Sequence, residues 1–361
     1  MKKGPLTVSA LIIKDLQIDH KSVPLKHPFV TALHRVDSIE AVRVQVVLSN
    51  GIVGVGTGTP NEKVTGDNLA SSTAIVEQAI KPVLVGADFT KWQQLLTLLK
   101  NSVLENTPAK AAVELALYDA RRQLYNCSLT NLLGGADDSV ITDYTISIGE
   151  PAQMASEARA LVKRGFTSLK IKLGEAAVED NIAVIKSIAK AAGPDIHLRL
   201  DMNQTWTKRT TMQAAQAWQQ AGLKIDFIEQ PLAASDLAGM AWLTAHCPYP
   251  IMADESVHSY QDAQKVVAMQ AADYINIKLM KTGGLSEAQK INDLAASHHI
   301  PTMLGCMIEP IESIAAACSF VLANPNVKFA DLDSIFMAEL DPDLSQFARC
   351  HANEIELINH D

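Results

Sequence analysis

The part of the chain that follows Gly135 repeats one pattern eight times. Short apolar segments rich in β-branched residues recur about every 25 residues, and stretches with the apolar spacing of helices lie between them. The strand segments are residues 143–148, 168–173, 197–201, 225–229, 250–254, 274–279, 301–305 and 328–333. Strands alternating with helices predict βαβ units, and eight of them favour a (β/α)8 barrel over an open sheet. The last unit is poor in helix, so a modified barrel of the α/β class is expected.

The preceding residues follow a different plan. Strand-like segments flank Asn50-Gly51, the sequence of a tight hairpin turn, and residues 66–126 then show helical periodicity. We therefore expect an α+β capping domain over residues 1–130 and a barrel over 131–340. The remaining residues, 341–361, are too few for another domain and are expected to pack back on the capping domain.

Charge and cysteine usage limit the classes of partner and compartment. The 361 residues carry a net charge of −9 without long runs of one sign, which argues against nucleic acid or an anionic membrane surface as partner. Lys14 and Asp15 interrupt the apolar stretch near the start, so neither a secretory leader nor a spanning helix is predicted. The five cysteines are scattered without a CxxC pair, which fits reduced thiols. A cytoplasmic protein with a small-molecule substrate is expected.

Charged residues follow the predicted barrel strands one after another. Lys170 and Lys172 alternate with apolar residues and so share one face of their strand. After Lys172, the next four strand segments each have a charged residue at or beside their end: Asp201, Glu229, Asp254 and Lys278. The spacings from one to the next are 29, 28, 25 and 24 residues, which is one βα unit each. Because active sites of such barrels lie at the carboxyl ends of the strands, these charges are predicted to meet at one mouth.

Taken singly, each of these residues has an ordinary explanation. A strand-end Asp often caps the next helix, and a Lys there is commonly solvated. Three carboxylates on adjacent strands, however, repel one another and need a cation, and hard oxygen ligands suit Mg2+. The lysines on either side could exchange protons with a substrate if burial and cationic neighbours such as Lys170 lower their pKa.

The motifs around these residues resemble the muconate-lactonizing subgroup of the enolase superfamily over nearly the whole chain. They are KIK at 170–172, RLDMNQTW at 199–206, EQP at 229–231, ADES at 253–256 and NIKLMKTGG at 276–284. The resemblance implies that Asp201, Glu229 and Asp254 bind Mg2+, that Lys172 and Lys278 are acid/base groups on opposite faces of the substrate, and that Lys170 polarises its carboxylate. It also implies that the first domain closes the site through residues 22–36 and 55–62. Asn203 and Glu255, within two of these motifs, are further site candidates.

Asp331-Leu332-Asp333 at the eighth strand distinguishes members of this subgroup. A DxD there resembles the dipeptide epimerases, whose aspartates hold the free ammonium of the N-terminal residue, and two carboxylates on one strand face would be costly without a cation. The alternative is a solvated acidic turn. Residues 24–36, 141–149 and 305–313 also resemble dipeptide epimerases, which implies substrate contacts for His34, Thr145, Cys306 and Met307. A structural or pocket-lining Cys306 is favoured over a nucleophile, since no His partner is evident.

Three features of the first domain bear on specificity and on other functions. Members acting on L-Ala-D/L-Glu often have Arg directly after a Thr-Ala-Leu segment, whereas His34 and then Arg35 follow here, so the C-terminal residue of the substrate is left open. Thr57 stands where relatives commonly have Glu. The GVGTG run at 54–58 lacks the lysine and βαβ context of a phosphate loop, which favours a turn.

The leading hypothesis is a Mg2+-dependent dipeptide epimerase, an isomerase that moves a proton at the α-carbon of the C-terminal residue and converts L,L to L,D dipeptides. The alternatives keep the same lysines and metal: an o-succinylbenzoate synthase, an N-acyl amino acid racemase or a muconate cycloisomerase. A silent binding protein is a third possibility, which the intact set of charged residues disfavours. A homo-oligomer is expected.

Overall fold

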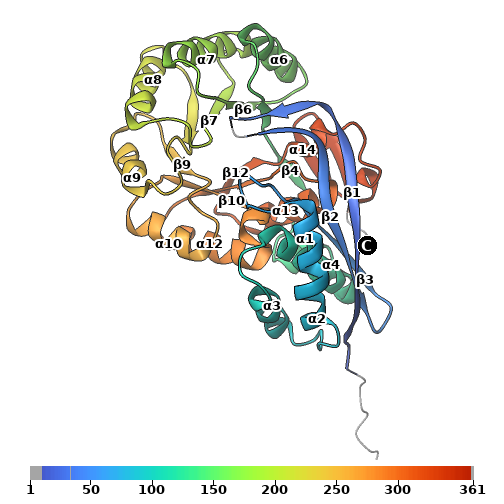
Figure 1. Ribbon diagram of the computed structural model, residues 1–361. Helices are drawn as coiled ribbons and strands as arrows, with labels where there is room; N and C mark the ends of the chain where they lie inside the picture. Colours follow the sequence, from blue (N-terminus) through green and yellow to red (C-terminus); the bar gives the residue numbers. More distant parts are fainter. Residues whose placement is uncertain (1–9, 33, 359–361) are drawn as a thin grey trace, which may run out of the picture.

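The computed structural model describes residues 10–32 and 34–358 and contains a capping region beside a barrel (Figure 1). The first three strands form an antiparallel sheet in the order β1 (Ile13–Val30), β2 (Arg35–Leu48) and β3 (Val53–Gly58). The helices that accompany this sheet are α1 (Leu69–Ile75), the π-helix η1 (Val76–Ile80), α2 (Lys81–Leu84), α3 (Trp92–Asn101), α4 (Thr107–Tyr125) and α5 (Leu129–Leu132). All of these helices except α5 contribute to a core with β1 and β2 that is separate from the barrel core, whereas Leu129 and Leu132 of α5 pack against the barrel core.

The glycines of the GVGTG run lie inside a strand, so the predicted turn is wrong. Gly54, Gly56 and Gly58 occupy one face of β3, and a Cβ added at any of them would lie 2.1–2.3 Å from a carbonyl oxygen of α4. No other residue allows helix and strand backbones to approach this closely. The repeat is therefore a packing device that seats α4 on the sheet.

Eight parallel strands form the barrel in simple sequence order, from β5 to β12. All but the last lie within one predicted segment each, and the last begins one residue before its segment: β5 (Tyr144–Ile146), β6 (Ser168–Lys172), β7 (His197–Asp201), β8 (Ile225–Glu229), β9 (Ile251–Ala253), β10 (Tyr274–Lys278), β11 (Thr302–Gly305) and β12 (Val327–Asp331). The Asp143 N–H donates to the Ala330 carbonyl at 3.3 Å, which brings the first and last strands together. The predicted barrel is confirmed.

Helices surround the strands on the outside (Figure 1). They are α6 (Pro151–Lys163), α7 (Val178–Ala192), α8 (Lys208–Gln220), α9 (Leu237–His246), α10 (Tyr260–Ala268), α11 (Leu279–Thr282), α12 (Leu285–Ser297), α13 (Ile311–Ala323) and α14 (Ser334–Met337). The helix that follows the eighth barrel strand, α14, has only four residues, in line with the weak helical pattern expected there. Within the described ranges, no helix has both the length and the apolar character needed to cross a membrane.

The tail contacts both parts of the molecule. After α15 (Leu344–Phe347), strands β13 (Ala348–His351) and β14 (Glu354–Leu357) form a small sheet with β4 (Ser139–Ile141), which precedes the barrel. Toward the capping sheet, the buried Lys21 ammonium of β1 lies 2.7 Å from Asp341 and 2.9 Å from Asp343, and 2.8 Å from Glu312 of α13. One cation thus joins the cap, the barrel and the tail.

Candidate active site

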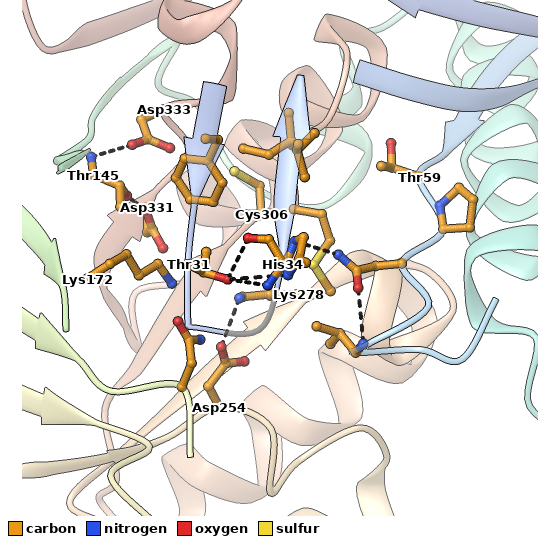
Figure 2. Close-up of a pocket in the computed structure, with 18 of the residues that line it drawn as sticks. Thr31, His34, Thr59, Thr145, Lys172, Asp254, Lys278, Cys306, Asp331 and Asp333 are labelled. Atoms are coloured by element: carbon orange, nitrogen blue, oxygen red, sulfur yellow. Dashed lines mark hydrogen bonds and ion pairs between the residues drawn. The ribbon is translucent and has the colours of Figure 1, made fainter. Parts of the chain in front are cut away.

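A pocket lies where the carboxyl ends of the barrel strands face the loop between β1 and β2 (Figure 2). The Ile148 N–H donates to the Val30 carbonyl at 3.1 Å, so the end of β1 is fastened to the segment that follows β5. Barrel residues supply the charged floor of the pocket, and cap residues supply most of its uncharged wall. The two parts of the molecule therefore complete one site together.

Two lysines of β6 point into the barrel, as their alternation predicts. The Lys170 ammonium lies 2.7 Å from Asp331, 2.8 Å from Glu229 and 3.2 Å from Asp201. The Lys172 ammonium lies 2.6 Å from the same Asp201 oxygen. Lys170 is thus enclosed by carboxylates, whereas Lys172 lines the open pocket.

Three acidic residues on neighbouring strands meet beside these lysines. Parallel pairing places Lys172 opposite Asp201, and Asp201 opposite Glu229, while Asp254 directly follows β9. These three carboxylates, which we call the central carboxylates, are at most 1% exposed, and one oxygen of each lies within 4.8 Å of the others. A buried set of three hard oxygen donors, with pocket space for water and substrate, fits Mg2+.

The second acid/base candidate approaches from the other side. Lys278 ends β10 and its ammonium lies 2.8 Å from Asp254, so Lys172 and Lys278 come from strands that flank the three bearing the central carboxylates. Both ammonium groups face the pocket with Asp254 below them (Figure 2). The structure therefore brings together all six charged residues predicted from the strand ends.

The pKa shifts of the charged residues in the pocket floor differ from those expected from the sequence. Burial acts to lower the pKa of Lys278, but the Asp254 carboxylate outweighs it, and the pKa is raised. Burial and the neighbouring Asp201 raise the pKa of Glu229 to about 8. For Asp254 burial is again outweighed, because Lys278 and a further lysine, Lys281, hold its pKa well below the usual range. In this arrangement the carboxylates are partnered by lysines, and the expected lowering of the lysine pKa values is not found at Lys278.

A second group of buried carboxylates lies where the barrel closes. Asp331 and Asp333 are 4% and 3% exposed, so the alternative of a solvated acidic turn is wrong. The Thr145 N–H donates to Asp333 and its hydroxyl donates to Asp331 at 3.4 Å. With Asp143, whose Oδ2 lies 2.8 Å from the Arg199 guanidinium, these residues form the closing carboxylates, Asp143, Asp331 and Asp333.

Two of the three aspartates of this group, Asp331 and Asp333, have opposite pKa shifts. Burial raises the pKa of Asp333 to about 7, and the nearby Asp331 adds to the effect. At Asp331 burial is outweighed by the Lys170 ammonium, which brings its pKa to about 2. The pair therefore carries one firm negative charge and one carboxyl that ionises near neutrality.

The loop between β1 and β2 places His34, and not Arg35, over the pocket. The Asn61 amide donates to Nε2 of His34 at 3.0 Å, and Nδ1 lies 3.3 Å from the Thr31 hydroxyl. Arg35 points away, 61% exposed and paired with Asp37 at 2.8 Å. Burial, with help from Lys172 and Lys278, lowers the pKa of His34, so the imidazole is neutral. Leu33 lies outside the described residues.

The remaining predicted residues occupy distinct places. Asn203 and Glu255 line the pocket and share a hydrogen bond of 3.2 Å, and the Asn203 N–H also donates to Asp201 at 2.9 Å. Cys306 and Met307 line the pocket too, and burial raises the pKa of Cys306 well above normal, which disfavours a thiolate nucleophile. Thr57 is buried in β3 and is not among the pocket residues.

Two residues behind the floor were missed by the sequence reasoning. Lys281, fully buried at the end of α11, places its ammonium 2.6 Å from Asp254 Oδ1 and 3.0 Å from the Asn276 carbonyl. The side-chain amide of Asn276 donates to Glu229 Oε1 at 2.8 Å. Both lie in the NIKLMKTGG run, where an inward-facing Asn on an apolar strand was the available signal.

The fold and these six charged residues define an enolase-type barrel with a capping domain. Residues 153–353 match the family described as enolase C-terminal domain-like, and residues 13–134 match the mandelate racemase / muconate lactonizing enzyme N-terminal domain. The protein belongs to this family of the enolase superfamily, as the sequence motifs predicted.

Within the family, the chain is similar to epimerases of dipeptides. It is 41% identical to the L-Ala-D/L-Glu epimerase of Clostridium acetobutylicum, over 92% of each chain. It is 40% identical to the Bacillus subtilis enzyme of the same name, over 89% of this chain and 87% of the relative. It is 38% identical to the hydrophobic dipeptide epimerase of Enterococcus faecalis, over 91% of this chain and 92% of the relative.

Solved structures agree with these relatives. The substrate-liganded L-Ala-D/L-Glu epimerase from Bacillus subtilis superposes with a TM-score of 0.93 at 37% identity, covering 96% of this chain and 97% of that one. The Enterococcus faecalis dipeptide epimerase complexed with Mg and L-Leu-L-Tyr gives a TM-score of 0.91 at 37% identity with the same coverage.

Proposed function

We propose that this protein is a Mg2+-dependent epimerase of dipeptides that inverts the α-carbon of the C-terminal residue. The observation that carries the proposal is the placement of Lys172 and Lys278 on opposite sides of the central carboxylates, with Asp331 and Asp333 at the end of the same pocket. Relatives at 38–41% identity carry dipeptide epimerase names, which supports it.

Asp201, Glu229 and Asp254 would hold the metal. When bound, Mg2+ supplies the positive charge that acidifies the α-proton and stabilises negative charge developing on the substrate carboxylate. With these carboxylates engaged by the metal, the ammonium groups of Lys172 and Lys278 would be free to turn toward the substrate. Lys170, held by three carboxylates, stays protonated and favours the same developing charge.

The two pocket lysines would exchange the proton. One neutral amine removes the hydrogen from the α-carbon, whose C–H electron pair delocalises into the carboxylate. The opposite ammonium then donates a proton to the other face of that carbon. The configuration inverts, and the lysines end with their protonation states interchanged.

Asp331 and Asp333 would hold the N-terminal end of the dipeptide. Asp331 and Asp333 present carboxylates that the Thr145 backbone and hydroxyl orient, and a substrate ammonium is the cation this geometry suits. Thr31, His34, Cys306 and Met307 would then contact the rest of the substrate, and Asn203 and Glu255 would order the floor.

Racemisation of an N-succinyl amino acid is the second candidate, since a racemase of N-succinyl-L-Arg/Lys from Bacillus cereus is 30% identical over 83% of this chain. The test is turnover of L,L-dipeptides and N-succinyl amino acids in deuterated water, followed by mass spectrometry and NMR. We expect one deuterium at the α-carbon of the C-terminal residue together with the L,D product. Turnover of N-succinyl amino acids without that of any dipeptide would reject the proposal.

The domain limits at 130 and 340, a cytoplasmic location and a homo-oligomeric state belong to the same proposal. Separate apolar cores in the capping sheet and in the barrel support the first of these. Light scattering coupled to size exclusion would give the assembly state, and a monomer would reject it.

A further inference from the structure

One strand of the cap presents a row of side chains to the pocket, and the last side chain of this row is a carboxylate. Val36, Ser38 and Glu40 alternate along β2 and so share a face, and all three line the pocket. Val36 packs with Phe29, Ile308 and Tyr144 in one apolar cluster. Tyr144 directly precedes Thr145, which orients Asp333, so this row begins at the end of the pocket that faces the closing carboxylates.

The Glu40 carboxylate is oriented but has no cationic partner among the described residues. The hydroxyls of Ser22 and Ser38 donate to the same oxygen, Oε1, at 2.6 and 2.7 Å, which leaves the second oxygen free. On the other face of the strand, Asp37 is already paired with Arg35. Glu40 is therefore a fixed negative charge at the rim of the pocket.

The rest of the cap wall carries no positive charge over the described residues that line the pocket. His34 is neutral, and its two ring nitrogens are engaged: the Asn61 amide donates to Nε2, so Nδ1 keeps the proton and donates to Thr31. Every other charged lining residue belongs to the barrel floor or to the closing carboxylates. A substrate side chain that reaches the cap thus finds apolar groups, hydroxyls and one carboxylate.

We propose that Glu40 is a specificity residue that selects dipeptides with a basic side chain on the N-terminal residue. This inference rests on the proposed function. With the substrate ammonium at Asp331 and Asp333, the methylene stem of Lys or Arg packs against Phe29 and Val36, and its charged head meets Glu40. An acidic side chain in the same place meets only negative charge and is disfavoured.

The test compares matched dipeptides in which only the side-chain charge differs. L-Lys-L-Ala and L-norleucyl-L-Ala have the same stem, and the ratio of their kcat/KM values isolates the ammonium group. Because Glu40 is at the exposed rim, we expect Glu40→Gln to lower this ratio about three- to tenfold at low ionic strength, and less at high salt. The control, Asp37→Asn, removes an equal charge from the opposite face of the strand and should leave the ratio unchanged.

The outcomes separate this inference from the proposed function. The assignment of Glu40 would be overturned if the kcat/KM ratio were unchanged in Glu40→Gln, or if it changed equally in Asp37→Asn. It would also be overturned if Glu40→Gln altered the preference for L-Ala-L-Lys over L-Ala-L-norleucine, where the basic side chain is on the C-terminal residue. Each of these results would leave a dipeptide epimerase in place. Absence of α-deuterium from every dipeptide would instead overturn the proposed function itself.

Discussion

The central and the closing carboxylates are alike in number, burial and spacing, yet they have different surroundings. Each group brings three carboxylate oxygens within 4.8 Å of one another. Around the central group stand the lysines 170, 172, 278 and 281, whose ammonium groups lie 2.6–3.2 Å away. Around the closing group, Arg199 holds Asp143 and Lys170 holds Asp331, while Thr145 donates to Asp333.

The two groups also differ in their relation to the pocket. Asp254 of the central group lines it together with Lys172 and Lys278, where a divalent ion would replace ammonium charge. In the closing group Asp143 is paired with an arginine that also lies 4.9 Å from the centroid of the Phe329 ring. Asp331 and Asp333 line the pocket, and they are the two members of this group that we propose to bind a substrate ammonium.

The largest expected effect separates the two pocket lysines from the rest of the charged floor. Lys172→Ala and Lys278→Ala should each abolish epimerisation, a loss on the order of 10³-fold or more, because inversion needs an acid and a base on opposite faces. Each variant is expected to exchange the α-proton of one epimer only, which NMR in deuterated water measures. Near-normal inversion by either variant contradicts the two-lysine mechanism.

Amide substitutions test directly whether the two carboxylate groups differ in metal binding. Asp201→Asn, Glu229→Gln and Asp254→Asn should weaken Mg2+ binding and lower turnover by about 10²- to 10³-fold, since they remove a ligand charge. Asp333→Asn is the matched control and should keep its Mg2+ affinity in calorimetric titration. Full activity in excess chelator, or equal loss of metal affinity in the control, would remove the distinction.

The sequence alone was enough to predict that the central carboxylates meet, because these residues lie at the ends of consecutive barrel strands. Lys172, Asp201 and Glu229 are one βα unit apart, and parallel pairing turns that spacing into contact. Asp143 could not be recognised in this way, since it meets Asp331 only through closure of the barrel. The choice of His34 over Arg35 also depends on how the turn after β1 is wound, which composition and periodicity do not fix.

N-acetylation of the substrate probes the closing group. It removes the ammonium charge that Asp331 and Asp333 are proposed to hold, at a cost of about 2–4 kcal/mol, or roughly 30- to 1000-fold in kcat/KM. Asp333→Asn should narrow this difference by harming the free dipeptide more than the acetylated one. Equal turnover of free and acetylated dipeptides would favour an N-acyl amino acid racemase.

A substitution at Lys281 tests whether its ammonium group, which lies behind the central carboxylates, contributes to Mg2+ affinity. Lys281→Met removes the ammonium that fixes Asp254 Oδ1, and we expect Mg2+ affinity to fall by about 10- to 100-fold while saturating Mg2+ restores most turnover. Lys290→Met, which breaks a partly buried pair with Glu287, is the control. Wild-type Mg2+ affinity in Lys281→Met would assign this lysine to folding alone.

The smallest expected effect is a pH dependence confined to the closing group. Because the pKa of Asp333 is raised to about 7, this carboxyl is neutral below that pH and ionised above it. Binding of the substrate ammonium should therefore strengthen as pH rises, by up to about fivefold in 1/KM between pH 6 and pH 7, below the range in which the substrate amine itself loses its proton. Asp333→Asn and an N-acetylated substrate should both flatten the profile, and a step that persists in the variant would trace to another group.

The bond between Thr145 and Asp333 also sets an order of events during biosynthesis. These residues are 188 positions apart, whereas Lys172 and Asp201 are separated by 29. A chain emerging from the ribosome can pair β6 with β7 early, but the contact between Thr145 and Asp333 forms only after β12 is released. The nascent protein thus brings its proposed proton-transfer and metal residues together before the proposed site for the substrate ammonium is complete.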